Sequence, residues 1–474
     1  MIKVSSTVND KDPIVVFVNK KTTQKMVQSE LSADYAELYQ SFKKAKKFKE
    51  DTPFVIRTGL TPKDPVMVVI ELGSDKVSTF RSVAGNVVRL LADESKVQWV
   101  SVASISNWEL HLAQVIPMSS YKVPNQKSDQ KKSTQANHTV ISKNKSFIQE
   151  GEVIGHAVNK ARSFANSPAN LLTTDSFVKE IKALFKSDKR YSVSVIDEAQ
   201  LKKKKMNALL GVGQGSKYPS YLVDITYKGG AGDAIALVGK GVMFDTGGIS
   251  IKPSRNMKEM KGDMGGAAAV VGAAWAAGQL NLKRPISFIV PIVENMVSAD
   301  AQRPGDVVVA SNGKSIEITN TDAEGRLILA DALVYAAKKK VSCILDIATL
   351  TGASIIALGP YAISVMGNHQ SVVDQLLTSS LEYDERCWQL PLFDEYKDLL
   401  KSDVADLLNA NEGREAGTIT AAKFLEQFVN DVPWAHLDIA STMSRSSTKG
   451  DQVKGMTGAG TRALISFMKH YKAS

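Results

Sequence analysis

The stretch Ser315-Ile-Glu-Ile-Thr-Asn-Thr-Asp-Ala-Glu-Gly-Arg-Leu-Ile-Leu-Ala-Asp-Ala-Leu333 contains two local patterns joined by a charged turn. Ile316 and Ile318 alternate with polar neighbours, which predicts a short strand. Further along, apolar residues recur at helical spacing and predict a buried helix. They are Leu327, Ala330, Val334 and Ala337. Strand, turn and helix in this order are typical of an α/β domain.

The turn between the two patterns carries two acidic residues, Asp322 and Glu324. Asn320 and Asp322 are residue types that favour the N-cap, so we expect the helix to begin here. Each carboxylate is favoured near a helix N-terminus, but two of them in a partly buried turn repel each other. Arg326, Lys314 or a metal ion could supply the positive charge. On this stretch alone, a capped helix with a surface ion pair explains the pattern equally well.

The 474 residues are enough for two or three domains with a large core. Hydrophobic residues make up 43% and charged residues 23%, an ordinary globular balance. The net charge of +10 leaves nucleic-acid binding open. Basic runs such as residues 202–205 and 338–340 are more typical of solvated helix ends. Helix-turn-helix, zinc-finger and RNA-recognition patterns do not accompany them.

Two cysteines, Cys343 and Cys387, are too few for a disulfide framework and suit a reducing compartment. Residues 1–13 lack the apolar core of a signal peptide. No apolar run approaches the length of about 20 residues that spans a bilayer. We therefore expect a soluble, cytoplasmic protein with no membrane partner.

The chain is predicted to have an α/β fold with two domains. Residues 1–120 alternate strand and helix signals and form a small N-terminal α/β domain, with strands that include residues 66–72 and 113–117. Residues 121–166 are predicted as a polar linker followed by a connecting helix. Residues 167–474 have longer apolar strands separated by helices, which predicts a mostly parallel sheet covered by helices on both faces. Sites in such sheets form at the carboxyl ends of the strands.

Two further loops place charges among glycines and apolar residues. Lys240 and Asp245 follow the predicted strand of residues 234–238, and Asp263 precedes an alanine-rich helix. Each alone could be a turn residue, an N-cap or a surface lysine. If the loops converge with Asp322 and Glu324, the four carboxylates call for two divalent cations. The histidines and cysteines avoid these loops, so an oxygen-rich site for Mn²⁺, Mg²⁺ or Zn²⁺ is predicted.

The octapeptide Asn320-Thr-Asp-Ala-Glu-Gly-Arg-Leu327 resembles the signature of the leucyl aminopeptidases, the cytosol aminopeptidase family of two-metal exopeptidases. Other blocks resemble the family in the same order: Val238-Gly-Lys-Gly-Val-Met-Phe-Asp-Thr-Gly-Gly248, Met260-Lys-Gly-Asp-Met-Gly-Gly-Ala-Ala268 and Asp346-Ile-Ala-Thr-Leu-Thr-Gly-Ala353. The resemblance covers most of residues 160–470. It implies that residues 167–474 are the catalytic domain of a metallopeptidase.

The resemblance implies a role for each matching residue. The implied metal ligands are Lys240, Asp245, Asp263, Asp322 and Glu324, with Lys240 bound as the neutral amine. Lys252 and Arg326 match the two catalytic side chains, and a bicarbonate ion near Arg326 would shuttle a proton. The pocket for the first substrate side chain would be lined by Met260, Thr349, Gly352, Ala440 and Met443. Ser441 stands where the family usually has glycine, close to the implied pocket.

The implied activity is the release of N-terminal amino acids, preferably leucine and other apolar residues, from peptides with a free N-terminus. Two metal ions per subunit, Mn²⁺ or Zn²⁺ with Mg²⁺ and Co²⁺ as further candidates, would bridge a hydroxide that attacks the scissile carbonyl. The family also implies a homohexamer. Two alternatives stay open: a DNA-binding regulatory role through the basic surface, and another two-metal hydrolase such as a phosphatase.

Overall fold

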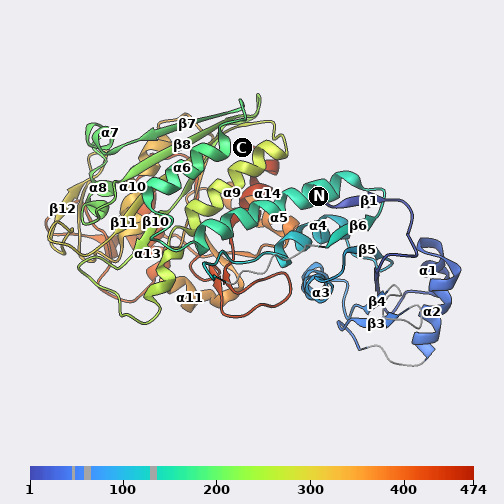
Figure 1. The fold of residues 1–474 in the computed structure, drawn as a ribbon. Coiled ribbons are helices and arrows are strands. Elements are labelled where there is room, and N and C mark those ends of the chain that lie inside the picture. Colours follow the sequence, from blue (N-terminus) through green and yellow to red (C-terminus); the bar gives the residue numbers. More distant parts are fainter. Residues whose placement is uncertain (45–48, 58–65, 129–135, 474) are drawn as a thin grey trace. The chain divides into compact units, whose positions relative to one another are not determined.

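The computed structural model describes residues 1–44, 49–57, 66–128 and 136–473, which form two compact units (Figure 1). Unit 1 contains Met1–Asn159 and Ser446–Lys454, and unit 2 contains Lys160–Arg445 and Gly455–Ser474. The division falls within helix α5 (Lys145–Asn166). The α/β fold class with two domains is therefore confirmed.

Unit 1 is built on a six-stranded sheet in the order β1-β6-β5-β2-β4-β3, parallel except for the edge pair β3 and β4. Alternate strand residues face opposite sides, so Phe17 packs with α3 and α4 while Val16 packs with α1 and α2. Its elements before α5 are β1 Lys3–Ser5, β2 Ile14–Val18, α1 Gln24–Glu30, α2 Ala33–Lys44, β3 Phe54–Arg57, β4 Val66–Glu71, α3 Val77–Leu90, β5 Lys96–Ser101, α4 Trp108–Ser119 and β6 Asn137–Ile141.

Two sequence predictions in this unit differ from the structure. Residues 113–117, predicted as a strand, lie inside helix α4, whose residues are buried on nearly all sides, so an apolar run there does not distinguish helix from strand. The predicted linker, of which residues 129–135 lie outside the described part, contributes strand β6 to the sheet. The late segment Ser446–Lys454 also joins this unit, where buried Arg81 donates from Nε to Asp451 at 3.0 Å.

Unit 2 holds a nine-stranded sheet with the order β16-β15-β18-β14-β9-β11-β8-β7 and β10 paired to β11. The run β18, β14, β9 and β11 is parallel. Its strands are β7 Tyr191–Ile196, β8 Tyr221–Lys228, β9 Ile235–Gly239, β10 Gly241–Asp245, β11 Pro285–Asn295, β14 Cys343–Ala348, β15 Ile363–Gly367, β16 Cys387–Gln389 and β18 Trp434–Asp438. Short pairings involve β12 Val307–Val309, β13 Ser315–Glu317, β17 Leu407–Leu408, β19 Ser444–Arg445 and β20 Gly455–Met456.

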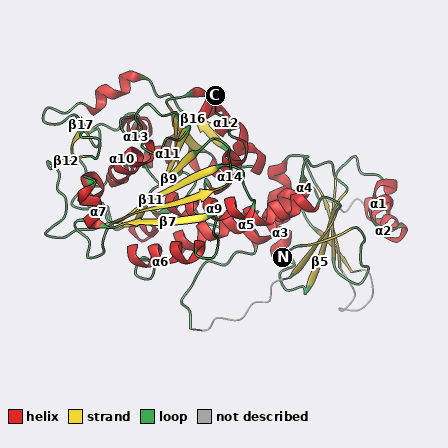
Figure 2. Ribbon diagram, turned by 90° about the horizontal axis from the view of Figure 1, so that it is seen from above, coloured by secondary structure: helices red, strands yellow, loops and turns green. Residues whose placement is uncertain are grey.

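Helices cover both faces of this sheet, as predicted (Figure 2). Helix α9, with α6 and α14, packs on one face, and α10, with α8 and α13, packs on the other. The helices are α6 Thr174–Phe185, α7 Glu198–Lys203, α8 Asn207–Gly213, η1 Met257–Gly262, α9 Gly265–Gln279, α10 Glu324–Ala337, α11 Gly352–Leu358, η2 Gly359–Tyr361, α12 Gln370–Ser380, η3 Leu381–Tyr383, η4 Asp394–Leu400, α13 Gly417–Glu426 and α14 Thr461–His470.

The surface charges follow the helix ends. Lys202 and Lys203 lie in the last turn of α7, and Lys338 is the C-cap of α10. Cations are favoured there by the helix dipole, which explains these basic runs without a ligand. Throughout the described ranges, no helix is both long and apolar enough to cross a bilayer.

Candidate metal centre and substrate pocket

The predicted charged residues lie at element ends along one edge of the unit 2 sheet. Lys240 separates β9 from β10, and Asp245 is the last residue of β10. Asp263 lies between η1 and α9, and Glu324 is the first residue of α10. Strand ends in a parallel sheet meet at a common edge, so the topology brings distant loops together.

The turn before α10 differs from the prediction in one respect. The N-cap is Ala323 and not one of the predicted residues 320–322. The Ala323 side chain makes no capping bond. Asn320 instead accepts from the backbone N–H of Asp322 at 2.9 Å, which fixes the turn. The Asp322 carboxylate is therefore left for the charged cluster.

Glycines allow the close approach of these loops. Gly247 and Gly248, directly after Asp245, have φ of +86° and +64°, which side chains with a Cβ rarely adopt. A Cβ at Gly325 would lie 2.6 Å from Cε of Lys240. Glycine at position 325 is thus required for the Lys240 side chain to pass beside α10.

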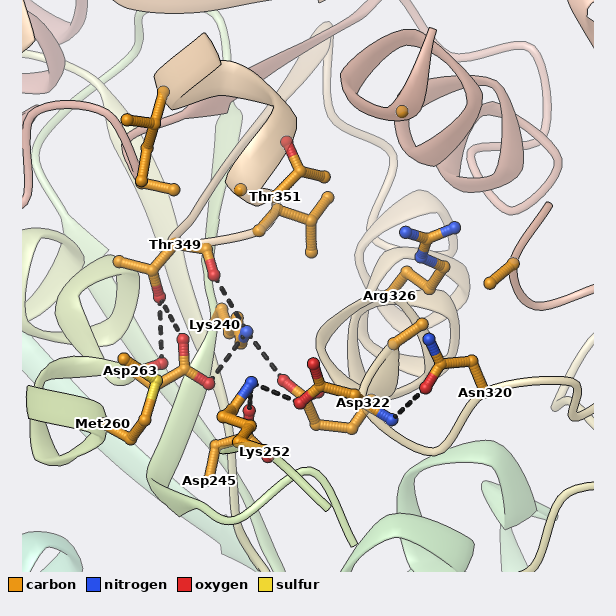
Figure 3. Close-up of a pocket in the computed structure, with 18 of the residues that line it drawn as sticks. Lys240, Asp245, Lys252, Met260, Asp263, Asn320, Asp322, Arg326, Thr349 and Thr351 are labelled. Carbon is orange, nitrogen blue, oxygen red and sulfur yellow. Dashed lines mark hydrogen bonds and ion pairs between the residues drawn. The ribbon is translucent and has the colours of Figure 1, made fainter. Parts of the chain in front are cut away.

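Lys240 forms one half of the cluster (Figure 3). Its Nζ lies 2.9 Å from Oδ2 of Asp263 and 2.7 Å from Oε1 of Glu324, and it donates to the Thr349 carbonyl at 2.9 Å. The Thr349 hydroxyl donates to Oδ1 of Asp263 at 2.7 Å. All four side chains are buried.

Lys252 forms the other half. Its Nζ lies 2.7 Å from Oδ2 of Asp245 and also contacts Oδ1 of Asp322. The other oxygen of Asp245 accepts from Nδ2 of Asn295 at 2.8 Å and from the Gly247 N–H at 2.9 Å. The two ammonium groups therefore lie between pairs of carboxylates, where a more highly charged cation could also bind.

Burial makes full ionisation of this cluster costly. It raises the pKa of Asp245 to about 6, with a further contribution from the Glu324 charge, against the opposing effect of Lys252 and Lys240. Burial likewise raises the pKa of Asp263 and Asp322. For Glu324, burial is outweighed by the two lysines, which lower its pKa. Two lysines do not neutralise four carboxylates, three of them buried, so additional positive charge would stabilise the cluster.

The donor set fits divalent metal ions. Oxygens of Asp245, Asp322 and Glu324 all lie within 4.8 Å of one another, a spacing that a single cation can bridge. Oδ2 of Asp263 and Oε1 of Glu324 are buried and lie against the Lys240 ammonium group. Carboxylate oxygens suit Mn²⁺ and Mg²⁺, and also bind Zn²⁺. The residues present therefore match the chemistry of a metal site.

Arg326 lies apart from the carboxylates (Figure 3). Its Nη1 donates to the carbonyl of Asn409 at 2.6 Å, while the buried Nε has no hydrogen-bond partner among the described residues. Burial lowers the pKa of Arg326 to about 10, against the opposing charges of Glu324 and Asp438, so the side chain stays cationic at neutral pH. It can therefore bind an anion at the pocket wall rather than neutralise the acidic cluster.

All of the residues predicted for the site line one cavity of about 480 Å³. The catalytic and metal candidates Lys240, Asp245, Lys252, Asp263, Asp322, Glu324 and Arg326 are joined by the pocket candidates Met260, Thr349, Gly352, Ala440 and Met443. The structure thus brings every predicted residue together, while the role of each one stays a prediction. Ser441 is buried and donates to the Ala362 carbonyl at 2.8 Å, and it is not among the residues that line the cavity.

Two supporting residues were not predicted. Asn295 ends β11 beside β10 and bonds both Asp245 and the Thr321 carbonyl, so the strand-end rule could have identified it. Asn409 is fully buried, donates to the Asn320 carbonyl at 2.7 Å and accepts from the Thr319 N–H at 2.8 Å. Its position in an irregular loop gives no sequence signal.

Comparison with known proteins agrees with the site. Residues 159–465 match the catalytic domain of the cytosol aminopeptidase family. The chain is 47% identical over 324 residues to a probable cytosol aminopeptidase of Syntrophotalea carbinolica and 47% identical over 327 residues to that of a Geobacter species. These matches cover 68% and 69% of the chain and only 65% and 66% of the two relatives.

Similarity to a solved structure extends over nearly the whole chain. The bottromycin maturation enzyme BotP in complex with Mn matches with a TM-score of 0.86 and 30% identity, covering 97% of this chain and 99% of BotP. Because the family match covers more than half of the sequence, the chain belongs to the cytosol aminopeptidase family.

Proposed function

We propose that the protein is a metal-dependent aminopeptidase that releases N-terminal amino acids, preferably leucine and other apolar residues, from peptides. The observation that carries this proposal is the convergence of four carboxylates and two lysines in one cavity. One part of that cavity is lined by Met260, Met443 and Ala440. Membership of the cytosol aminopeptidase family supports the same activity.

The proposed metal ligands are Lys240, Asp245, Asp263, Asp322 and Glu324, with Asp245 and Glu324 shared between two ions. Two divalent cations would supply an activated water molecule, a site for the substrate's α-amine and positive charge for the developing oxyanion. BotP has been solved in complex with Mn, which supports Mn²⁺ as the first metal to test, beside Zn²⁺, Mg²⁺ and Co²⁺.

Lys252 and Arg326 are the proposed catalytic side chains. The Lys252 side chain is 20% exposed at the cavity, so its ammonium group can donate to a substrate carbonyl oxygen as negative charge develops there. Arg326 stays protonated and is a poor base. We propose that its open donors would hold a bicarbonate ion, which would supply a proton acceptor beside the substrate.

The proposed preference for apolar first residues rests on the pocket wall. Gly352 has open space around the position of a Cβ, so a methyl group there would extend into the pocket without strain. Gly352→Ala should therefore lower kcat/KM for leucyl and phenylalanyl anilides more than for alanyl anilide. Equal losses for all three substrates would contradict the assignment of this wall.

The proposed activity is tested by Lys252→Ala and Asp322→Ala. Both should reduce hydrolysis of a leucyl anilide to background while the far-UV circular dichroism spectrum stays that of the wild type. Full activity in both variants would remove the proposal. Turnover of a phosphate ester without peptide turnover would instead favour another two-metal hydrolase.

We also propose that the protein acts in the cytosol as a homohexamer. The names of its relatives support the location. Large apolar side chains on the surface support self-association, since such residues are normally covered: Ile356 is 87% exposed and Tyr361 is 74% exposed. Light scattering coupled to size-exclusion chromatography should give six times the 51.3 kDa chain mass, and a monomer would contradict the assembly.

A further inference from the structure

The loop after β14 forms the wall of the proposed side-chain pocket, and a buried carboxylate lies behind it. Thr349, Leu350, Thr351 and Gly352 all line the cavity, whereas Asp438, at the end of the neighbouring strand β18, does not. We infer that Asp438 is a positioning residue that fixes this loop and thereby sets which first side chains the enzyme accepts. The inference rests on the proposed aminopeptidase function and deepens it.

Asp438 bonds both sides of the pocket wall. Its Oδ1 accepts from the backbone N–H groups of Leu350 at 3.2 Å, Thr351 at 3.5 Å and Ala440 at 3.1 Å. Its Oδ2 accepts from the Thr351 hydroxyl at 2.5 Å. The side chain is fully buried, so water does not compete for these bonds. One carboxylate therefore sets the spacing between the β14 loop and Ala440.

The Thr351 hydroxyl extends this anchor to two helices. The single hydroxyl hydrogen of Thr351 is donated to Oδ2 of Asp438. The Thr418 hydroxyl, 2.9 Å away in the first turn of α13, must then donate to Thr351. The Ser354 N–H donates to the same oxygen at 3.2 Å and so caps α11, whose Ile355 also lines the cavity. The hydroxyl has no bonding capacity left over.

The other end of the loop is bound to the candidate metal ligands. Thr349 accepts from Lys240 through its carbonyl and donates to Asp263 through its hydroxyl. The loop therefore spans two anchors, one at the metal cluster and one at Asp438. Loss of the second anchor should move the pocket wall while the metal ligands stay in place, which predicts altered substrate selection rather than lost metal binding.

The Asp438→Asn variant of the Mn²⁺-loaded protein tests this inference. The amide has the shape of the carboxylate, but its NH₂ group donates where Oδ2 accepted, so the bond to Thr351 must reverse. We expect KM for leucyl anilide to rise about tenfold and the preference for leucyl over alanyl anilide to fall about tenfold, because small displacements of a binding wall weaken selection strongly. The value of kcat should change by less than about threefold and the bound Mn²⁺ should stay at the wild-type level.

A matched pair at Thr418 tests the same network without touching the pocket or the carboxylate. Thr418→Val removes the hydroxyl at almost unchanged volume and should shift KM and preference in the same direction as Asp438→Asn, by a smaller factor. Thr418→Ser keeps the hydroxyl, so KM and substrate preference should stay at their wild-type values. If Asp438→Asn fails to fold, this pair decides the question.

Hydrogen exchange separates the inference from the proposed function. Amide exchange at Leu350, Thr351 and Ala440 should be at least about tenfold faster in Asp438→Asn and unchanged in Thr418→Ser, because the neutral amide oxygen that remains accepts these N–H groups less strongly than the carboxylate did. A wild-type protein inactive on every aminoacyl anilide would overturn the proposed function and the selectivity role together, leaving only the anchor measured by exchange. An active wild type whose Asp438→Asn variant keeps KM and preference within about twofold overturns this inference alone.

Discussion

Helix α10 carries two fully buried carboxylates, and they have opposite properties. Glu324, its first residue, lies 2.7 Å from the Lys240 ammonium group, and the two nearby lysines overcome burial and lower its pKa. Asp331 lies about two turns further along the same side of the helix. No ion pair joins it to a cation in the described part of the chain. It accepts from the backbone N–H groups of Leu209 at 3.0 Å and Ser311 at 2.7 Å, and burial raises its pKa to about 6.

The comparison teaches that burial of an acidic residue does not by itself mark a functional site. Glu324 lines a cavity together with other charged groups, and its carboxylate contacts the Lys240 ammonium group there. Asp331 is not among the residues that line that cavity, and it joins α10 to helix α8 and to the turn between β12 and β13. Glu324, the catalytic candidate, is distinguished from Asp331, the structural residue, by the other charged groups around it and by its position at a cavity.

The largest expected difference between the two carboxylates is in activity. Glu324→Gln keeps the volume of the side chain but removes the charge that we assign to both metal ions. We expect kcat/KM for leucyl anilide to fall by about 10³-fold or more, the order found when a central electrostatic group is removed. Asp331→Asn should stay within about threefold of the wild type. Comparable losses of kcat/KM in Glu324→Gln and Asp331→Asn would contradict the assignment of different roles to the two residues.

Metal removal should also distinguish Glu324 from Asp331. Chelation should abolish activity and lower the free energy of unfolding, because the four carboxylates then repel one another. Restoring Mn²⁺ at a hundred times its dissociation constant should raise that free energy by about 2.7 kcal/mol. Chemical denaturation should show this gain in wild type and in Asp331→Asn, and little of it in Glu324→Gln. A full gain in Glu324→Gln would mean that this residue is not a ligand.

Much of the site follows from the sequence because its residues sit at strand ends and beside glycines. The motif around Asp322 and Glu324, together with Lys240 and Asp245, predicts convergence, since parallel strands share a carboxyl edge. Asp331 lies in the same stretch, but no local sequence pattern indicates a role for it. Its hydrogen-bond donors, the backbone N–H groups of Leu209 and Ser311, are brought to it only by tertiary packing.

The parts that the sequence does not predict depend on packing in the same way. Asn409 bonds a segment far away in the chain, and no local pattern indicates it. Residues 113–117 read as an apolar run that fits a strand, yet they lie in helix α4, which is buried on nearly all sides. Periodicity alone does not distinguish a helix from a strand where every face of the element is buried.

The next largest effect is on the free energy of unfolding. Here we expect substitution of Asp331 to matter more than substitution of Glu324, the reverse of the effect on activity. Asp331→Ala leaves two buried backbone N–H groups without an acceptor, each costing about 1–3 kcal/mol. We expect the free energy of unfolding to fall by about 2–4 kcal/mol. Asp331→Asn keeps one acceptor oxygen and should lose about half as much. Measured by urea denaturation, a change below about 0.5 kcal/mol in Asp331→Ala would show that the two N–H groups find other partners.

The smallest effect is the pH dependence of that stability. In the unfolded chain an aspartate titrates near pH 4. In the folded protein burial raises the pKa of Asp331 to about 6, although the N–H groups of Leu209 and Ser311 oppose the shift. Between these values the folded protein holds a proton that the unfolded chain has released. The free energy of unfolding contributed by Asp331 should therefore decrease as pH rises from about 4 to about 6, by at most about 3 kcal/mol, and then stay constant.

The Asp331→Asn variant isolates this contribution because an amide does not titrate in this range. The stability difference between wild type and variant should shrink from pH 4 to pH 6 and stay flat from pH 6.5 to pH 8. Other carboxylates titrate in both proteins and cancel in the difference. A difference that grows with pH would mean that the folded protein favours ionised Asp331, as the lysines favour ionised Glu324, and the contrast along α10 would then disappear.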